Sequence, residues 1–297
     1  MTFRTRFAPS PTGPLHLGHA FSALVAYDWA QAQGGEFLLR IEDIDQSRAR
    51  PEWESQIYED LTWLGVTWPR PVMRQSERMA DYGAALDRLW EQGLLYPCHC
   101  SRSDIAAATS APQEGAPQLG PDGVVYPGTC RDLSPRIGPR PRNVTLRFDI
   151  AKALHGDLSR LGFEEHGMNA GKVSLDVSRL PKTVGDFVIA RRDMGTSYHL
   201  AVVLDDDAQA ITHVVRGVDL FDATQIHVLL QQVLDLPTPH YLHHPLVRDE
   251  QGKRLAKRDD ARAISLYRSE GLARRDILAK LDVYRAMLTQ DFKLNGL

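Results

Sequence analysis

The chain has 297 residues, 43% of them hydrophobic and 25% charged, which is the composition of a globular protein with a large core and excludes a disordered or fibrous chain. Its net charge of −3 gives no overall sign of a nucleic-acid partner, although a local basic surface is enough to bind one. Because Arg4 and Arg6 interrupt any secretory segment and no apolar run reaches the roughly 18 residues of a membrane span, we expect a cytoplasmic protein without membrane contact.

The beginning of the chain predicts a βαβ unit. Strands are expected at residues 3–8 and 36–41, and a helix at residues 18–33 that ends before Gly34 and Gly35. Two strands joined through a helix favour a parallel sheet, and open sheets of this kind bind ligands at the carboxyl ends of their strands.

Further helices and strands are expected along the rest of the chain. Apolar residues at helical spacing predict helices at residues 51–64, 77–92 and 219–234, and helical structure from residue 263 to the end. Short apolar runs predict strands at residues 144–148, 173–177, 186–190, 201–204 and 211–215. Between residues 111 and 141, seven prolines and five glycines favour irregular structure that needs an external staple.

The segment between the first strand and the first helix favours a phosphate-binding site. Residues 6–20 read Arg-Phe-Ala-Pro-Ser-Pro-Thr-Gly-Pro-Leu-His-Leu-Gly-His-Ala. A helix N-terminus offers unpaired N–H groups and the positive end of the helix dipole, and His16 and His19 are spaced to face the same side. A turn with two surface histidines would explain a short His-x-Gly-His pattern, which recurs by chance, but not the whole ordered run.

The run resembles the nucleotide-binding element of class I aminoacyl-tRNA synthetases, specifically of their glutamyl and glutaminyl branch. That resemblance implies that His16, Gly18 and His19 bind ATP.

The same resemblance implies a cationic loop that closes over ATP. Residues 252–258, Gly-Lys-Arg-Leu-Ala-Lys-Arg, lie where this loop is expected, so Arg254 and Lys257 would also bind ATP. Lys257 and the two histidines would be the catalytic residues that stabilise charge on the phosphates. The loop departs from the Lys-Met-Ser-Lys pattern, because Arg254 replaces a lysine and Ala256 replaces the serine. We therefore expect altered loop ordering and a lower affinity for ATP. Without the resemblance, a solvated basic turn would explain these charges.

The resemblance further implies a pocket for glutamate. Its residues would be Arg6, Ala8, Ser10, Glu42, Tyr198 and Arg216. A dicarboxylic amino acid needs an acidic group for its ammonium and cationic forks for its side-chain carboxylate, which arginine recognises in a bidentate way. We expect Glu42 to take the ammonium. Arg6, Arg216 and the Tyr198 hydroxyl would take the γ-carboxylate. The alternative explanation for each of these residues, taken one at a time, is a surface ion pair.

The three cysteines favour a structural metal site. Cys98, Cys100 and Cys130 flank part of the proline- and glycine-rich region and supply three of the four ligands that a structural zinc ion takes. The residues alone leave the fourth ligand open between Tyr126 and His99, and resemblance to bacterial synthetases favours Tyr126. Inert cysteines are the alternative. We expect one zinc ion that staples the insertion.

The resemblance implies an α/β fold, namely a class I synthetase Rossmann-like parallel sheet with a zinc-stapled insertion and a small C-terminal helical domain. The expected catalytic domain is split over residues 1–95 and 175–237. Residues 96–174 would form an acceptor-type insertion, and residues 238–297 a C-terminal loop and helical domain. Full-length glutamyl-tRNA synthetases continue into anticodon-binding domains, which we do not expect here.

The length and the cysteine-containing element resemble the stand-alone paralogues of glutamyl-tRNA synthetase. This implies activation of L-glutamate with ATP and Mg²⁺ to glutamyl-adenylate, followed by transfer to queuosine in the anticodon loop of tRNA(Asp). Two alternatives stay open. One is glutamylation of another acceptor, either a tRNA 3′ end or a molecule other than RNA, and the other is a synthetase-like binding protein. We expect a monomer.

Overall fold

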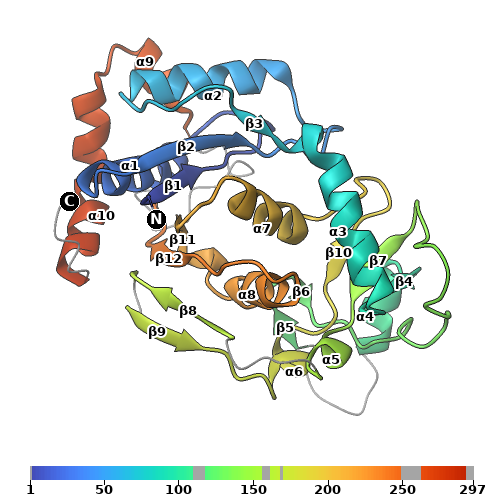
Figure 1. The fold of residues 1–297 in the computed structure, drawn as a ribbon. Coiled ribbons are helices and arrows are strands. Elements are labelled where there is room, and N and C mark those ends of the chain that lie inside the picture. The colour runs from blue at the N-terminus through green and yellow to red at the C-terminus, as the bar shows by residue number, and fades with distance from the viewer. Residues whose placement is uncertain (1, 110–117, 156–160, 168–169, 249–261, 292–297) are drawn as a thin grey trace.

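The computed structural model describes residues 2–109, 118–155, 161–167, 170–248 and 262–291 (Figure 1). Its strands are β1 (Arg4–Phe7), β2 (Glu36–Ile41), β3 (Met73–Arg74), β4 (Leu95–Cys98), β5 (Leu119–Gly120), β6 (Gly123–Val124), β7 (Thr145–Phe148), β8 (Gly162–Glu165), β9 (Gly171–Ser174), β10 (Val188–Ala190), β11 (His213–Gly217) and β12 (His240–His244). Its α-helices are α1 (Leu17–Ala32), α2 (Pro51–Trp63), α3 (Met79–Glu91), α4 (Arg102–Thr109), α5 (Ile150–Ala153), α6 (Leu180–Thr183), α7 (Tyr198–Ala208), α8 (Thr224–Val233), α9 (Ile264–Ser269) and α10 (Arg274–Asp291). Two short 3₁₀ helices are η1 (Gln75–Arg78) and η2 (Val218–Leu220).

The central layer consists of two sheets that meet between β1 and β11. One sheet has the order β1-β2-β3 and the other the order β11-β12-β8-β9, and every pair in them is parallel except β8 with β9. At the junction, the backbone N–H of Thr212 donates to the Arg4 carbonyl at 3.0 Å, and the backbone N–H of Arg4 donates to Thr212 Oγ1 at 2.8 Å. The chain therefore runs outward in two directions from β1 and β11, which is the arrangement that places a ligand at the carboxyl ends of these strands.

Helices cover both faces of this layer. Successive residues of β11 alternate between two hydrophobic cores, with Val214 in the core that contains α7 and α8, and Val215 in the core that contains α1, α2 and α10. Tyr241 and Leu242 on β12 divide in the same way, as expected for a strand buried on both faces. The predicted α/β fold with a parallel sheet is confirmed.

The turn from α1 into β2 requires glycine. Gly34 has a φ of +59°, which only glycine adopts without strain, and a Cβ atom on Gly35 would lie 2.2 Å from the carbonyl oxygen of Phe3. These two residues let α1 end directly above the sheet, so that its N-terminus lies at the carboxyl end of β1.

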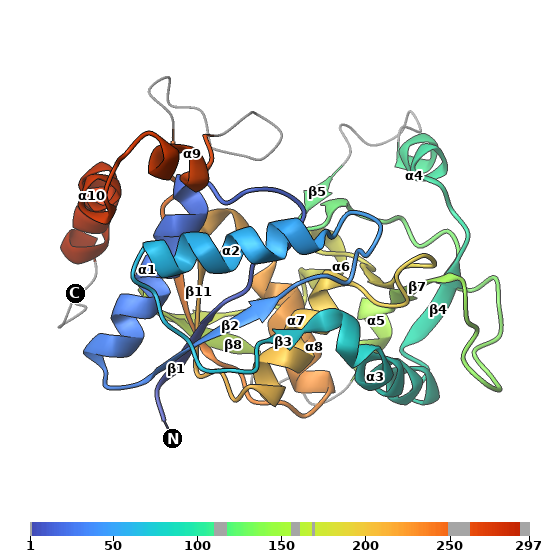
Figure 2. The same cartoon turned by 90° about the horizontal axis from the view of Figure 1, so that it is seen from above.

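A separate antiparallel sheet has the order β10-β7-β4. With the β5-β6 hairpin and α4 it lies at one side of the molecule, while α9 and α10 lie at the other side (Figures 1 and 2). Cys98 ends β4, and its side chain packs in a small cluster with Cys100, Tyr126 and Cys130.

The predicted strand at residues 201–204 is wrong, because this segment lies inside α7. The run Ala-Val-Val-Leu is apolar on every side, which does not distinguish a buried strand from a buried helix. The helix cap favours the helix over the strand, because Ser197 precedes the helix and its hydroxyl accepts a hydrogen bond from the Leu200 backbone N–H at 3.4 Å. In the described parts of the chain, no helix combines the length and the apolar character that a membrane crossing requires.

Candidate active site

A cavity of about 350 Å³ opens at the carboxyl ends of β1, β2 and β11. The predicted residues that line it are Arg6, Ala8, His16, Gly18, His19, Glu42, Tyr198 and Arg216. Ser10, in the loop after β1, is not among the lining residues. The lining also includes Asp219, His244 and Val247, which the sequence did not single out. The structure therefore gathers into one cavity residues that lie up to 210 positions apart between Arg6 and Arg216.

Two histidines cap α1 and line the cavity. His16 Nδ1 accepts a hydrogen bond from the Gly18 backbone N–H, and His19 Nδ1 accepts one from the His16 backbone N–H, both at 3.1 Å. An imidazole nitrogen that accepts carries no proton, so in the neutral form both rings carry their proton on Nε2. The two rings lie with centroids 3.8 Å apart. The caps thus orient two N–H donors at a helix N-terminus, which suits an anionic ligand.

Gly18 is required for this arrangement. A Cβ atom on Gly18 would lie 3.0 Å from His16 Cε1, closer than side chains normally approach a ring. Any larger residue would push the His16 ring away from its capping position. The glycine between the histidines therefore has a steric role rather than a conformational one.

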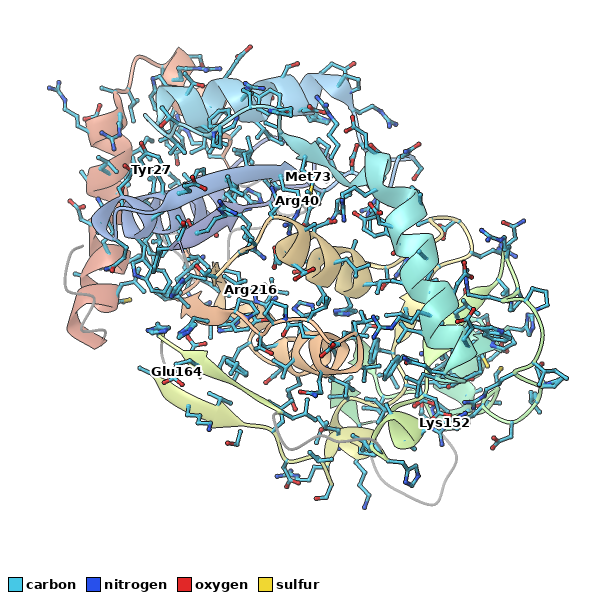
Figure 3. The ribbon with its side chains drawn as sticks, in the orientation of Figure 1. Tyr27, Arg40, Met73, Lys152, Glu164 and Arg216 are labelled. Atoms are coloured by element: carbon cyan, nitrogen blue, oxygen red, sulfur yellow. The ribbon has the colours of Figure 1, made fainter. Side chains whose placement is uncertain are left out.

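A buried charge cluster forms the wall beneath the cavity. Asp206 on α7 accepts from Arg6 Nε at 3.0 Å and from Arg40 Nη1 at 2.7 Å, and Arg40 Nη2 donates to Glu42 Oε1 at 3.2 Å. Arg40, near the end of β2, points from this strand toward α7 (Figure 3). The Arg40 side chain is fully buried and also lies 3.8 Å from Asp205. Arg78 Nε in turn donates to Asp205 Oδ1 at 2.7 Å, so three guanidinium groups face three carboxylates and the charges of the wall balance.

The pKa values of two carboxyl groups in this wall, Glu42 and Asp206, shift in opposite directions. Burial raises the pKa of Glu42 above its ordinary value, although Arg40 and Arg6 act to lower it. For Asp206, burial also acts to raise the pKa, but Arg6 and Arg40 outweigh it and the pKa is lowered. Asp206 is therefore the permanent counter-ion of the arginines, while Glu42 is a partly compensated carboxylate at the cavity.

Arg216 is held by three side chains on α8 and β12. Its Nη2 donates to Thr224 Oγ1 at 2.7 Å, its Nη1 to His227 Nδ1 at 2.9 Å, and its Nε to His243 Nε2 at 3.1 Å. His243 Nδ1 lies 2.6 Å from a carboxylate oxygen of the buried Glu165. A guanidinium has five N–H donors, so two remain beyond these three bonds for a ligand in the cavity.

The histidines around Arg216 have defined tautomers. Since arginine only donates, His227 Nδ1 accepts, and its proton on Nε2 points to His199 Nδ1 at 3.1 Å. Burial and the Arg216 charge lower the pKa of His227 well below its ordinary value, which keeps the ring neutral. His199 Nε2 lies 3.7 Å from Asp122, in the turn between β5 and β6. A chain of polar groups thus links the insertion to the guanidinium in the cavity.

Tyr198 begins α7 beside this network. Its ring contacts those of His199 and His227. Burial raises the pKa of Tyr198, while Arg216 acts to lower it, so the hydroxyl keeps its proton and can donate to an anionic group.

The cationic loop predicted at residues 252–258, with Arg254, Ala256 and Lys257, lies outside the described residues. Its flanks are described and both reach the cavity. Val247 lines the cavity, and Ala263 pairs with His16 through a β-bridge, next to the bond from the Ile264 backbone N–H to the Leu15 carbonyl at 2.8 Å.

The structure brings the three cysteines together with Tyr126. Tyr126 Oη lies 3.4 Å from Cys98 Sγ and 3.3 Å from Cys100 Sγ, and Cys100 Sγ lies 3.4 Å from Cys130 Sγ. Ligand atoms of a tetrahedral zinc ion with sulfur and oxygen ligands lie roughly 3.5–3.8 Å from one another. The four side chains therefore fit a zinc ion after small adjustments. His99 is exposed and is not part of this cluster.

Arg147 closes one side of the cluster. Its Nε donates to Cys98 Sγ at 3.3 Å, and its guanidinium carbon lies 3.7 Å from the Tyr126 ring centroid. The same crowding shifts a pKa: burial acts to raise the pKa of Cys130, but hydrogen bonds with Tyr126 and with the His99 backbone outweigh it and lower the pKa to about 7. A thiol near its thiolate form and a nearby cation suit a metal-ligating cluster.

Comparison with known proteins identifies the family. A model of the catalytic domain of class I tRNA synthetases (E and Q) matches residues 2–290. The chain belongs to this family. A glutamyl-Q tRNA(Asp) synthetase from Rhodobacter capsulatus is 60% identical over 276 residues, which cover 92% of this chain and 97% of the relative. One from Geobacter sulfurreducens is 43% identical, over 88% of this chain and 77% of the relative.

Solved structures of this synthetase family agree with the fold. A glutamate tRNA ligase from Elizabethkingia meningosepticum, in complex with its amino acid, superposes with a TM-score of 0.73 at 26% identity. The match covers 100% of this chain and 66% of that ligase chain. The predicted class I synthetase fold is thus confirmed.

Proposed function

We propose that this class I synthetase activates L-glutamate with ATP and transfers the glutamyl group to queuosine in the anticodon loop of tRNA(Asp). The observation that carries the proposal is one cavity that joins a histidine-capped helix N-terminus, the Glu42 carboxylate and an arginine held by buried histidines. The relatives named above, which match nearly the whole chain, bear this activity in their names.

In the first step, an α-carboxylate oxygen of glutamate attacks the α-phosphorus of ATP, and pyrophosphate leaves. We assign the Nε2–H groups of His16 and His19 to the phosphates, since they converge at the N-terminus of α1. Gly18 allows this approach. Mg²⁺ enters with ATP as part of the substrate. Lys257 and Arg254 are assigned to the same phosphates because both flanks of their segment reach the cavity.

Charged side chains of the cavity position the glutamate substrate. Glu42 accepts the ammonium group, and the two remaining N–H donors of Arg216 take the γ-carboxylate together with the Tyr198 hydroxyl. Arg6 contributes charge from beneath, paired with Asp206. We further assign Ala8 and Ser10 to the edge of this site. Glutamine would leave Arg216 without a counter-charge, so it is a poor substrate.

In the second step, a hydroxyl of the queuosine diol attacks the carbonyl carbon of the glutamyl-adenylate. AMP leaves with the bond electrons, and the hydroxyl proton passes to solvent. A nucleoside presented in an RNA loop is accessible to such a site, because its base is not enclosed in a duplex. Since tRNA is its substrate, we place the enzyme in the cytoplasm, as a monomer.

A structural zinc ion completes the proposal. Cys98, Cys100, Tyr126 and Cys130 would hold it, because their mutual distances approach those of a tetrahedral site. The ion would join the two ends of the segment from residue 98 to residue 130, within the proposed insertion. We also propose a division into residues 1–95 with 175–237, residues 96–174 and residues 238–297.

Two measurements test the activity. Labelled glutamate and ATP are incubated with tRNA(Asp) that carries or lacks queuosine, with tRNA(Glu) as a control. Label should enter only queuosine-bearing tRNA(Asp), and equal labelling without queuosine would refute the acceptor. Labelled tRNA(Glu) would identify a 3′-end activity instead. Glutamate-dependent exchange of pyrophosphate into ATP tests the first step alone. If no exchange occurs, the chain is a synthetase-like binding protein rather than an enzyme.

A further inference from the structure

A cluster of three histidines lies at the opposite end of β11 from the cavity and takes no part in the proposed reaction. His213 begins β11 and is paired in register with His240, which begins β12. His166 follows β8, and its backbone N–H donates to the Tyr241 carbonyl at 2.7 Å. Three neighbouring strands therefore bring three imidazoles to one edge of the sheet.

The nitrogen atoms are close enough to share one ion. One ligand nitrogen from each ring lies within 4.8 Å of the others, and His166 Nε2 lies 2.9 Å from His240 Nδ1. Imidazole ligands of a tetrahedral metal ion, at about 2.0 Å from it, lie roughly 3.3 Å from one another. Binding would separate one pair of nitrogens by a few tenths of an ångström and draw the third ring closer.

Thr212 contacts the second nitrogen of the third ring. Its Oγ1 accepts from the Arg4 backbone N–H at 2.8 Å, and it lies 3.3 Å from the Arg4 carbonyl and 2.8 Å from His213 Nδ1. When the hydroxyl proton points to the carbonyl, Oγ1 accepts from His213 Nδ1–H and His213 Nε2 carries the lone pair that a metal ion needs. A ring held through its second nitrogen is the usual support of a histidine ligand.

Aromatic side chains hold two of the rings in place. Phe3 stacks on His213 with centroids 3.8 Å apart, and Trp29 presents its edge to His213 at 5.0 Å and to His166 at 5.5 Å. Burial and the neighbouring His240 lower the pKa of His166 and bring that of His213 to about 3, so both rings are neutral at physiological pH. Glu164, labelled on β8 in Figure 3, adds negative charge beside His166.

We propose that His166, His213 and His240 form a binding site for a divalent transition-metal ion of the zinc type, distinct from the cysteine cluster and from the cavity. Three imidazole ligands select borderline ions such as Zn²⁺, Co²⁺ and Ni²⁺ over Mg²⁺ and Ca²⁺, which take oxygen ligands. The ion links β8, β11 and β12, and water completes its coordination.

The test uses untagged, full-length protein that is stripped with a chelator and titrated with Co²⁺. Cobalt at the cysteine cluster gives intense sulfur-to-metal charge-transfer absorption, whereas cobalt on three imidazoles gives only weak ligand-field bands. We expect one Co²⁺ with charge transfer and a second without it. Because Trp29 contacts two of the rings, the second ion also quenches its fluorescence. Trp29→Phe should lose this quenching and keep both ions.

Two variants separate the site from simple packing. His213→Phe keeps a ring against Phe3 and removes the nitrogen, and His240→Asn changes a more exposed position. Each should lose the second ion while the charge-transfer band remains. His155→Ala, an exposed histidine outside the cluster, should bind both ions. A wild-type protein that binds no cobalt beyond the charge-transfer site, or variants that retain the second ion, would show that the cluster only packs.

Discussion

Substitution of Glu42 by glutamine should make the protein more stable and nearly inactive. Burial raises the pKa of this carboxyl group, so its ionised form at neutral pH costs folding free energy. The group stabilises the fold only below its unfolded pKa, and that contribution is lost as the pH rises through the higher folded value. Glutamine keeps an oxygen for Arg40, which lies 3.2 Å from Glu42, and removes the charge.

The structure sets the size of both effects. Removal of one buried, partly compensated charge should raise the free energy of unfolding by on the order of 1 kcal/mol at pH 7. Loss of the charge that faces the substrate ammonium should cost about 2–5 kcal/mol of binding, because one partner of a desolvated ion pair is then missing. At about 1.4 kcal/mol for each factor of ten, kcat/KM for glutamate should fall roughly 30- to 4,000-fold.

Urea unfolding at pH 5 and pH 7 and glutamate-dependent pyrophosphate exchange measure these effects. The stability advantage of Glu42→Gln should shrink towards pH 5, as the wild-type carboxyl group takes up its proton. Glu91→Gln, an exposed position at the end of α3, is the matched control and should change neither quantity. A variant that is no more stable than the wild type and keeps exchange activity within threefold would refute the assignment.

The other predictions concern the wall, the arginine, the loop and the cysteines. Asp206→Asn should lower the free energy of unfolding by about 3–5 kcal/mol at pH 7, since Arg6 loses its hydrogen-bonded carboxylate and Arg40 loses one of its three. The pKa of Asp206 is lowered in the folded state, so the difference from wild type should begin to shrink as the pH falls below about 4 and should be lost only as the pH passes through the lower folded pKa; equal urea midpoints at pH 7 would contradict this. His227→Phe should raise KM for glutamate more than it lowers kcat, whereas His227→Asn, with an acceptor oxygen for Arg216, should recover much of the loss; identical kinetics for the two would exclude a positioning role. Lys257→Ala should lower pyrophosphate exchange by orders of magnitude, and an unchanged rate would remove Lys257 from the mechanism. In protein that carries His213→Phe, so that the histidine cluster adds no ion, zinc content should be close to one per chain and should fall when Cys98→Ala and Cys130→Ala are added in a variant that still folds; full zinc content there would refute the cysteine site.

The sequence predicts those parts of the site that lie in short, continuous segments of the chain. His16, Gly18 and His19 occur in one run, and the residues around Glu42 and Arg216 each form a short recognisable segment. Local patterns of this kind predict the strands and helices in which they occur. The predicted strand at residues 36–41 has the same bounds as β2, because the turns and helix ends that delimit a βαβ unit lie close by in the sequence.

The supports of the site could not be predicted in this way. Asp206 meets Arg6 across 200 positions, and His243 meets Glu165 across 78, so the contact exists only after the sheet forms. The strand β12, with three histidines in five residues, lacks the alternation that identifies strands. For the same reason the apolar run in α7 was assigned to the wrong element, because burial on all sides removes the periodic signal.

The way Arg216 is held restricts how this enzyme can be altered, whether by evolution or by design. Thr224, His227 and His243 each give the guanidinium an acceptor, and each would be left buried without its donor if Arg216 alone were replaced. A neutral side chain at position 216 that accommodates glutamine would therefore bind the new substrate but would destabilise the fold around α8 and β12. A change of amino-acid preference should require α8 and β12 to mutate together, so intermediates with a single substitution should be both unstable and unselective.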